Sequence, residues 1–145
     1  MSREEDVFKV QLLTEHATCP KIATKLSAGY DLYAQSDGVI LAGKRKKIDL
    51  GCTVEIPTGY YGQICSRSSL SLKNGIMTMG GVIDADYRGE LSVLLFNCSE
   101  TDFHYSKGDR IAQMVIIKIY TEAPILVMEV SATNRSVGGF GSTGV

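Results

Sequence analysis

Two aspartates, followed by a tyrosine and an arginine, form the stretch of this sequence best suited to chemistry. The stretch is Gly81–Gly89 (GVIDADYRG), with a glycine at each end. The glycines permit backbone conformations and close approaches that side chains would block. Val82 and Ile83 are typical of the end of a buried strand, so we expect rigid neighbours to aim the Asp84 carboxylate. Alternatively, the aspartates and glycines only form a hairpin turn.

A second stretch, Gly138–Gly144 (GGFGSTG), lies near the end of the chain. Its glycines free the backbone to surround an anion with N–H groups. Ser142 and Thr143 add hydroxyl donors, Arg135 adds a planar positive charge, and Phe140 could cover an aromatic ring. This composition predicts a lid over a ligand, although an ordinary mobile tail has the same glycine content.

Two shorter stretches could assist these. In Arg67–Lys73 a strand end runs into a predicted helix over residues 68–73, whose start Ser68 and Ser69 could cap. A helix start can bind phosphate, but an ordinary capped helix has the same sequence. In Gly108–Gln113 a tight turn leads to a glutamine inside an apolar strand. A buried amide needs partners, which could be a ligand or a structural hydrogen bond.

The rest of the chain predicts a nearly all-β domain with many short strands, and therefore a sandwich, jelly roll or barrel. The basic run at residues 42–47 is interpreted as a solvated hairpin turn; a nuclear-import patch or a phosphate contact are the alternatives. The predicted strands are residues 7–13, 28–34, 39–41, 53–56, 61–65, 91–96 and 111–120, with a weaker one at Val127–Val130.

Composition limits the classes of function. With 145 residues, 44% of them hydrophobic and 21% charged, the chain can form one globular domain with a core. The net charge of −1 argues against a nucleic-acid-binding domain, which is usually basic. The four cysteines lack metal-finger spacing, and no signal peptide or membrane-length apolar run is apparent. We therefore expect an intracellular protein with reduced, mostly buried cysteines.

A change in composition divides the chain. Residues 1–130 carry the predicted strands, whereas residues 131–145 are small, polar and rich in glycine. We expect a β domain over residues 1–130 followed by a C-terminal arm over residues 131–145, which is mobile unless something holds it.

In this order, the motifs resemble those of the trimeric deoxyuridine triphosphatase (dUTPase) family. The most specific matches are Gly81–Gly89 and the terminal GGFGSTG. The resemblance covers the chain from residue 28 to residue 144. The five matching stretches are residues 28–34, 67–71, 81–89, 108–113 and 135–144.

The resemblance implies a dUTP diphosphatase that converts dUTP to dUMP and pyrophosphate with Mg²⁺. Such an enzyme keeps uracil out of DNA and supplies dUMP for thymidylate synthesis. The implied subunit is jelly-roll-like with one short helix, and three subunits form a ring in which each arm reaches a neighbour's active site. Neither a membrane nor stable nucleic-acid binding is implied.

The resemblance also implies roles for residues. Asp84 would activate the attacking water, Tyr87 would exclude a 2′-hydroxyl, and the hairpin around Gly81 would read uracil. Phe140 would cover the base, and Asp31 would hold Mg²⁺ through water. The residues that would bind the phosphates or form the closed arm are Arg67, Ser68, Ser69, Gln113, Arg135, Gly141, Ser142 and Thr143.

The chain departs from the family pattern at four positions. Ser66 stands where proline is usual, and Ser69, Met79 and Ser136 stand where glycine is common. None of these removes a catalytic side chain. Two other readings remain: a dCTP deaminase-like enzyme of the same fold, which shares Arg67–Leu70 (RSSL), and a non-catalytic nucleotide sensor or protein-binding module.

Overall fold

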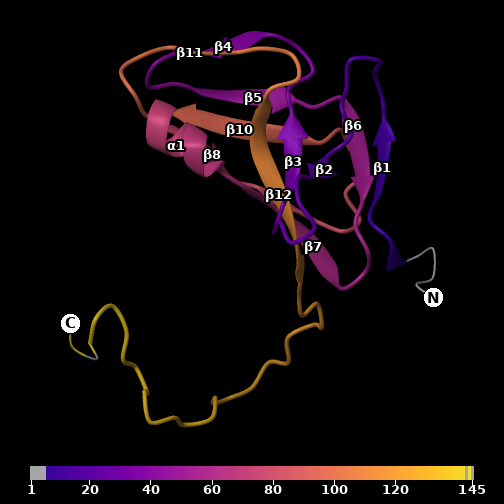
Figure 1. Ribbon diagram of the computed structural model, residues 1–145. Coiled ribbons are helices and arrows are strands. Elements are labelled where there is room, and N and C mark those ends of the chain that lie inside the picture. Colours follow the sequence, from indigo (N-terminus) through magenta and orange to yellow (C-terminus); the bar gives the residue numbers. More distant parts are fainter. Residues whose placement is uncertain (1–5, 143, 145) are drawn as a thin grey trace.

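The computed structural model describes residues 6–142 and 144, which form a body of short strands with one helix and a long C-terminal extension (Figure 1). The elements are β1 (Lys9–Leu12), β2 (Lys21–Ile22), β3 (Tyr30–Tyr33), β4 (Gly38–Ile40), β5 (Arg45–Asp49), β6 (Cys52–Glu55), β7 (Tyr60–Cys65), α1 (Ser68–Asn74), β8 (Ile76–Met79), β9 (Val82–Ile83), β10 (Ser92–Asn97), β11 (Phe103–Tyr105) and β12 (Arg110–Lys118).

The largest sheet has the strand order β2-β3-β12-β7-β9, and it contains most of the candidate site. The long strand β12 pairs antiparallel with β3 on one side and β7 on the other. Three smaller sheets surround it, with the orders β1-β6, β5-β10-β8 and β11-β4. Antiparallel strands in several small sheets are typical of a jelly-roll-like sandwich.

The core forms because strands alternate between buried and exposed side chains. Along β10, Val93, Leu95 and Asn97 are buried, whereas the residues between them are partly exposed. Leu32 of β3 and Met114 of β12 are fully buried in the same core. Burial of one face of each strand fixes the register, because a slip of one residue would expose the apolar side chains.

The all-β, jelly-roll-like prediction and the short helix are confirmed, but two local predictions are wrong. The basic run at residues 42–47 is not simply a turn, because its second half lies in β5. Cross-strand pairing with β10 makes this half a strand despite its charge. The weaker strand predicted at Val127–Val130 does not form, and the described chain beyond Lys118 has no strand or helix.

Burial differs from expectation at two places. All four cysteines are free, as expected, but Cys52 is buried while Cys19 and Cys98 are exposed. Val82 has 62% of its surface exposed because β9 is a two-residue edge strand. Within the described residues, no helix is long and apolar enough to cross a membrane.

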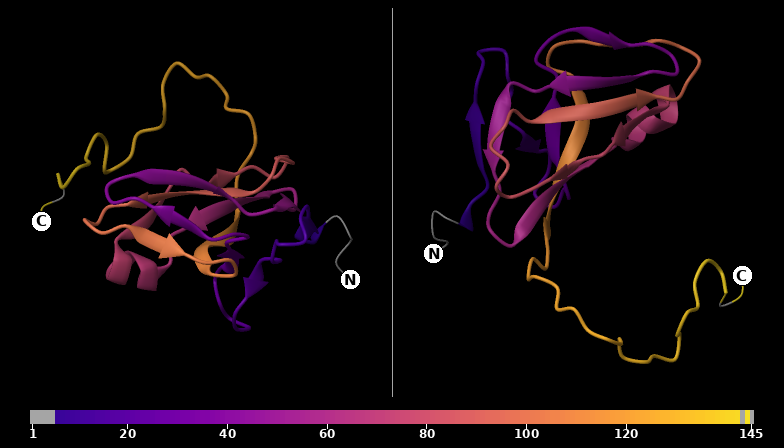
Figure 2. Two further views of the ribbon diagram at one scale, coloured as in Figure 1. Left: turned by 90° about the horizontal axis from the view of Figure 1, so that it is seen from above. Right: turned by 180° about the vertical axis from the view of Figure 1, so that it is seen from behind.

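The chain leaves the body at the end of β12. The backbone N–H of Ile119 donates to the carbonyl of Gly59 at 2.9 Å, and the described hydrogen bonds beyond it join only neighbouring residues. Residues 120–142, the C-terminal segment, then extend away from the strands (Figures 1 and 2). The predicted boundary at residue 130 falls inside this segment and stays a prediction.

Candidate active site

Three polar side chains form a row across the largest sheet. Gln113 of β12 stands opposite Asp31 of β3 on one side and Cys65 of β7 on the other. Directly opposed residues on antiparallel strands have neighbouring side chains. We call these residues the strand row, and it joins two of the predicted site residues that are far apart in sequence.

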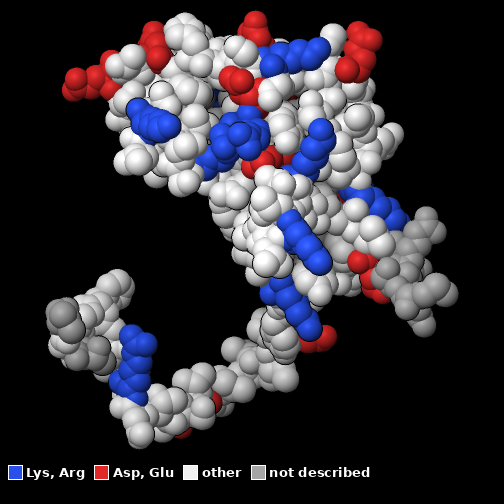
Figure 3. All heavy atoms as spheres, in the orientation of Figure 1, with Lys and Arg blue, Asp and Glu red and all other residues white. Residues whose placement is uncertain are grey.

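Two arginines adjoin the strand row. The Arg110 guanidinium lies 3.6 Å from an Asp31 carboxylate oxygen, and the Asp31 side chain is only 14% exposed. Arg67 donates from Nη1 to the carbonyl of Arg110 at 3.0 Å. Figure 3 shows basic side chains next to acidic ones in the middle of the body. Two guanidinium groups located where β7 ends and β12 begins can hold phosphate oxygens.

A hollow of about 320 Å³ lies between these arginines. Its lining includes Arg67, His104, Asp109 and Arg110. The hollow is therefore charged, and it is large enough to admit part of an anionic ligand.

The Gln113 amide is held by its neighbours. Its Nε2 donates to the Ser66 carbonyl at 3.1 Å, and a Cβ at Gly29 would come within 2.7 Å of its Oε1. Ser66 is anchored in turn, because its Oγ accepts the N–H of Thr78 at 2.9 Å. The structural hydrogen bond considered for Gln113 is thus present, and one amide hydrogen remains for a ligand.

The expected serine caps of α1 are wrong. Arg67 is the N-cap residue, and no side chain makes a capping hydrogen bond there. Ser68 is exposed and Ser69 is partly buried at the first turn. The serine that bonds elsewhere in the helix is Ser71, whose Oγ donates to the carbonyl of Ile76 at 2.8 Å.

The tight turn before Asp84 depends on glycine. Gly80 and Gly81 have φ angles of +64° and +100°, a region that disfavours other residues. A Cβ at Gly81 would lie 2.8 Å from the Ile64 carbonyl oxygen, whereas its own carbonyl accepts the Ile64 N–H at 2.8 Å. A hollow of about 300 Å³ adjoins this turn, and Met79 and Ile83 contribute to its wall. Polar groups at this turn include the backbone of Gly81 and Ile64 and the Gln63 side chain, while Lys47 and Ser92 contribute to the wall of the hollow.

The loop after β9 carries the candidate base. Asp84 is exposed, and its backbone carbonyl accepts the N–H of Tyr87 at 3.1 Å. The Tyr87 ring is 43% exposed, and its hydroxyl donates to the Glu90 carbonyl at 2.9 Å. The loop thus presents a carboxylate and an aromatic face to solvent.

The strand row and the Asp84 loop do not meet within one chain. On β7, Cys65 pairs with Gln113, whereas Gly62 pairs with Ile83. These positions are roughly 10 Å apart at the usual rise of a strand, and Asp84 continues away from Gln113. The strand row and the Asp84 loop are therefore separate parts of the candidate site in this chain, and we call them the two half-sites.

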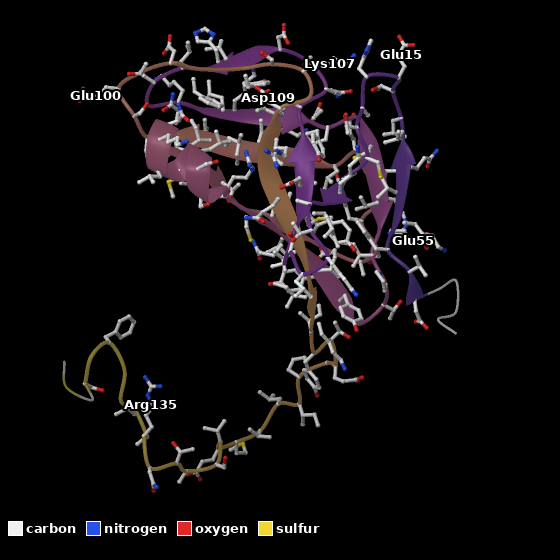
Figure 4. All side chains as sticks on the ribbon, in the orientation of Figure 1. Glu15, Glu55, Glu100, Lys107, Asp109 and Arg135 are labelled. Atoms are coloured by element: carbon white, nitrogen blue, oxygen red, sulfur yellow. The ribbon has the colours of Figure 1, made fainter. Side chains whose placement is uncertain are left out.

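The predicted arm residues are remote from both half-sites. Arg135 lies on the C-terminal segment, well away from the strands (Figure 4), and its Nε donates to the Gly138 carbonyl at 2.7 Å. Phe140 and Ser142 are exposed, and Gly141 has a φ of +83°. Thr143 lies outside the described residues.

Ser136, which stands where the family usually has glycine, adopts a backbone conformation that favours glycine. Its φ is +49°, in the left-handed region where glycine is unstrained and other residues are uncommon. The serine is tolerated through a local turn, in which its N–H lies 3.2 Å from the Thr133 carbonyl.

A metal ion would find few protein ligands. Among residues 6–142 and 144, no three His, Cys, Asp or Glu side chains gather into a metal-binding cluster. Asp31 offers a single carboxylate, next to Arg110, which lines the charged hollow. This donor set fits Mg²⁺, which keeps most of its waters and uses few protein oxygens when phosphates are present.

The fold and the candidate site can be compared with those of known proteins. The class that these features define is a jelly-roll-like β protein whose candidate site combines two arginines with a glycine-rich turn. More particularly, the dUTPase family model matches residues 15–144, and the chain belongs to the dUTPase family.

The relatives match along nearly their whole length. The deoxyuridine 5'-triphosphate nucleotidohydrolase of Kluyveromyces lactis is 48% identical over 140 residues, covering 94% of this chain and 93% of the relative. That of Saccharomyces cerevisiae is 44% identical over 141 residues, covering 97% and 96%. The Staphylococcus bacteriophage 80alpha dUTPase with dUpNHpp has a TM-score of 0.91 at 31% identity, covering 97% of this chain and 99% of that one.

Two arginines were not selected from the sequence as site residues. Arg110 lies inside a recognised motif, but its pairing with Asp31 depends on the β3–β12 register. Arg88 lies in the central motif, and its contacts to the Asp84 loop come from a turn of the backbone. In the sequence, the one indication that Arg88 and Arg110 belong to the site is that glycine and aspartate residues lie next to them in the motifs.

Proposed function

We propose that this chain hydrolyses dUTP to dUMP and pyrophosphate. The observation that carries the proposal is the near full-length match to deoxyuridine 5'-triphosphate nucleotidohydrolases, in a chain that retains the Gly81–Gly89 motif. The bacteriophage 80alpha dUTPase, whose fold this chain shares, has been solved with the dUTP analogue dUpNHpp. An enzyme acting on dUTP would keep uracil out of DNA and supply dUMP within the cell.

Asp84 would act as the general base. Its exposed carboxylate has room for a water molecule, and its backbone carbonyl accepts one turn hydrogen bond from Tyr87. A carboxylate in this position would take a proton from the water as the oxygen attacks the α-phosphorus. The pyrophosphate leaves on the opposite side of the phosphorus, so alignment supplies much of the rate enhancement.

The hairpin would select the base and the sugar. Backbone donors and acceptors at Gly80 and Gly81 can read the uracil edge, and the close approach of Ile64 limits space for a thymine methyl. Cytosine would present the wrong edge to the same groups. The exposed ring of Tyr87 can pack on deoxyribose and leave no room for a 2′-hydroxyl.

The strand row and its arginines would bind the phosphates. Arg67 and Gln113 have donors near the junction of β7, β12 and α1, and Ser68 and Ser69 lie at the start of α1. Asp31 would hold Mg²⁺ through water, and the ion would neutralise phosphate charge. A structural Mg(II) ion is described for the related dUTPase of phage phi11 of S. aureus, which has a TM-score of 0.81 at 28% identity.

A complete site would require other copies of the chain. The half-sites are separated in one subunit, and the C-terminal segment reaches away from both. The segment also exposes apolar side chains, with Ile125 86% and Leu126 98% exposed, which a neighbouring surface would cover. We therefore propose a homotrimer in which the arm residues Arg135, Phe140, Gly141, Ser142 and Thr143 close over a neighbour's nucleotide.

Release of pyrophosphate from dUTP, dTTP, dCTP and UTP with Mg²⁺ tests the proposal. We expect selective release from dUTP, reduced at least a thousandfold in Asp84→Asn because the base is lost. Asp86→Asn is the matched control, since Asp86 is also an exposed carboxylate of this loop. Binding of dUTP without turnover would instead support a nucleotide sensor.

The second candidate is a dCTP deaminase-like activity, favoured by the Arg67–Leu70 sequence. Ammonia release from dCTP measures it directly. Appreciable release from dCTP, with no pyrophosphate from dUTP, would overturn the main proposal.

A further inference from the structure

The loop that carries Asp84 is exposed and has little hydrogen bonding of its own. It follows β9, which is two residues long, and residues 86–89 are exposed. Its internal backbone bond is that from Tyr87 to Asp84. A carboxylate on such a loop needs additional contacts to stay in one position, because catalysis depends on alignment to within a fraction of an ångström.

Arg88 supplies contacts inside the loop. Its Nη1 donates to the carbonyl of Ala85 at 2.6 Å and lies 3.2 Å from the carbonyl of Tyr87. Ala85 directly follows Asp84, and Tyr87 directly precedes Arg88. The guanidinium of Arg88 thus contacts the backbone of its own loop at Ala85 and at Tyr87.

Strand β6 holds this arginine to the body. Arg88 Nη2 lies 3.6 Å from a carboxylate oxygen of Glu55. Glu55 is the last residue of β6 and is labelled in Figure 4. The Thr53 hydroxyl lies 3.0 Å from the carbonyls of both Arg88 and Gly89, and it can donate to either. Leu91 then donates to the Cys52 carbonyl at 2.7 Å, so the chain returns to β6 directly after the loop.

The rest of β6 is well supported. It pairs with β1 over four residues, including Lys9 opposite Glu55. A polar hollow of about 280 Å³ lies between Glu55, Thr58 and the loop residues Ala85 and Asp86. Solvent can therefore enter beneath the loop, and Arg88 is the side chain seen to bridge this space.

We propose that Arg88, held by Glu55, is a positioning residue for the Asp84 base. The proposal rests on the proposed hydrolysis of dUTP. Arg88 does not need to touch the substrate: it fixes the carbonyls of Ala85 and Tyr87 and so limits the positions that the Asp84 carboxylate can take. The planar guanidinium suits this role, because it can donate to backbone carbonyls while facing a carboxylate.

The test compares three substitutions in the full-length protein. Arg88→Met removes every donor, Arg88→Lys keeps the charge without the fork, and Glu55→Gln removes the charged partner of the arginine. We expect kcat for dUTP to fall roughly a hundredfold in the first, about tenfold in the second and a few-fold in the third. The KM should stay within about threefold, since uracil and phosphate contacts are elsewhere.

Lys9→Gln is the matched control. It removes the other ion pair of Glu55, at 3.7 Å and with similar exposure, but Lys9 has no hydrogen bond to the loop. We expect wild-type kcat for this variant and an unchanged shape of the pH profile of kcat in all variants. If the profile shifts in Arg88→Met but not in Arg88→Lys, Arg88 acts through its charge and the positioning role is overturned.

Two further outcomes distinguish a failure of this inference from misfolding of a variant and from a failure of the proposed function. If Arg88→Met does not fold, Arg88→Lys and Glu55→Gln decide, and wild-type kcat in both overturns the inference. If the wild-type chain itself does not hydrolyse dUTP, the proposed function fails first. In that case the loop contacts remain, and the ordering of Asp84 can be followed by its resonance in the variants; an unchanged resonance would overturn the inference.

Discussion

The body and the C-terminal segment carry candidate substrate residues in opposite ways. In the body, Gln113 lies between two paired strands and bonds to the Ser66 carbonyl. In the segment, Arg135 bonds only to a carbonyl three residues away, and Phe140 has its ring exposed. The body residues are positioned before any ligand arrives, whereas the segment residues have local turns alone.

This difference separates stability from activity. Side chains of the body contribute to the core and to the half-sites together, so a change there can affect folding. The segment contributes no core residue, so its removal should leave the body folded. Ordering the segment over a ligand also has an entropic cost, which only a contact with nucleotide or a neighbouring subunit can offset.

Among the changes that compare the two regions, removal of Arg135–Val145 should reduce activity strongly while leaving the body folded. We expect kcat/KM for dUTP to fall roughly a hundred- to a thousandfold, about 3–4 kcal/mol of transition-state stabilisation, because the lid and its arginine are lost. The melting temperature and oligomeric state should match those of the full chain, as measured by scanning calorimetry and light scattering. Retention of full activity, or unfolding, would show that the segment is not a lid.

Mixing experiments sharpen this test. If each arm serves a neighbouring subunit, the truncated chain supplies Asp84 and an inactive Asp84→Asn chain supplies the arm. Refolding the two together should restore part of the activity that each lacks alone. No recovery, with mixed assemblies shown to form, would place the arm over the Asp84 of its own chain.

Asn97→Ala should have the largest effect on stability. Asn97 is fully buried, and its Nδ2 donates to the carbonyls of Ile40 and Thr101 while its Oδ1 accepts from Ser99. Loss of this network leaves buried backbone groups without partners, at a cost of about 2–4 kcal/mol in the free energy of unfolding. Urea unfolding at fixed protein concentration measures it.

Asn134→Ala is the control within the C-terminal segment, where Asn134 is exposed. We expect no measurable change in its free energy of unfolding. Equal destabilisation by both substitutions would mean that the segment packs on the body in solution, and the contrast between the two regions would fail.

Much of the fold could be predicted because burial leaves a period of two in the sequence. The strands around Leu32, Val54 and Val93 alternate clearly, and the helix at Ser68–Asn74 was also predicted. Strands β2, β8 and β11 were not predicted, because each is at most four residues long and a period of two is hard to recognise in so short a run. β5 was missed because cross-strand pairing holds a lysine-rich strand that local composition assigns to a turn.

The site residues could be selected from the sequence, but their arrangement could not. The motifs point to Asp84 and Gln113, and they remain candidates by chemistry and resemblance. Their separation into two half-sites follows from the pairing of β7 with both β9 and β12, which no local pattern encodes. Likewise, the contact of Arg88 with Glu55 joins residues whose types are common on any surface.

A surface contact of the body should show the smallest effect. Ser92 Oγ donates to Asp49 Oδ1 at 2.6 Å, and this bond, with smaller help from Lys47, holds the pKa of Asp49 below its ordinary value of 3.8 against the opposing effect of burial. A lowered pKa in the folded state means that the stabilisation is present above pH 3.8 and is lost as the pH falls below it. Ser92→Ala should therefore reduce the free energy of unfolding at pH 7 by less than about 1 kcal/mol, because the carboxylate is half exposed.

The pH dependence distinguishes this bond from simple packing. Urea unfolding of wild type and Ser92→Ala should differ at pH 7, and the difference should be smaller at an acidic pH below 3.8, where the Asp49 carboxylate begins to take up a proton. Lys47→Met is the matched control, because Lys47 lowers the pKa of Asp49 less than Ser92 does. It should reduce the free energy of unfolding at pH 7 by a smaller amount than Ser92→Ala. An equal loss at both pH values would assign the effect of Ser92 to packing, since a contact that depends on the charge of Asp49 must weaken when that charge is removed.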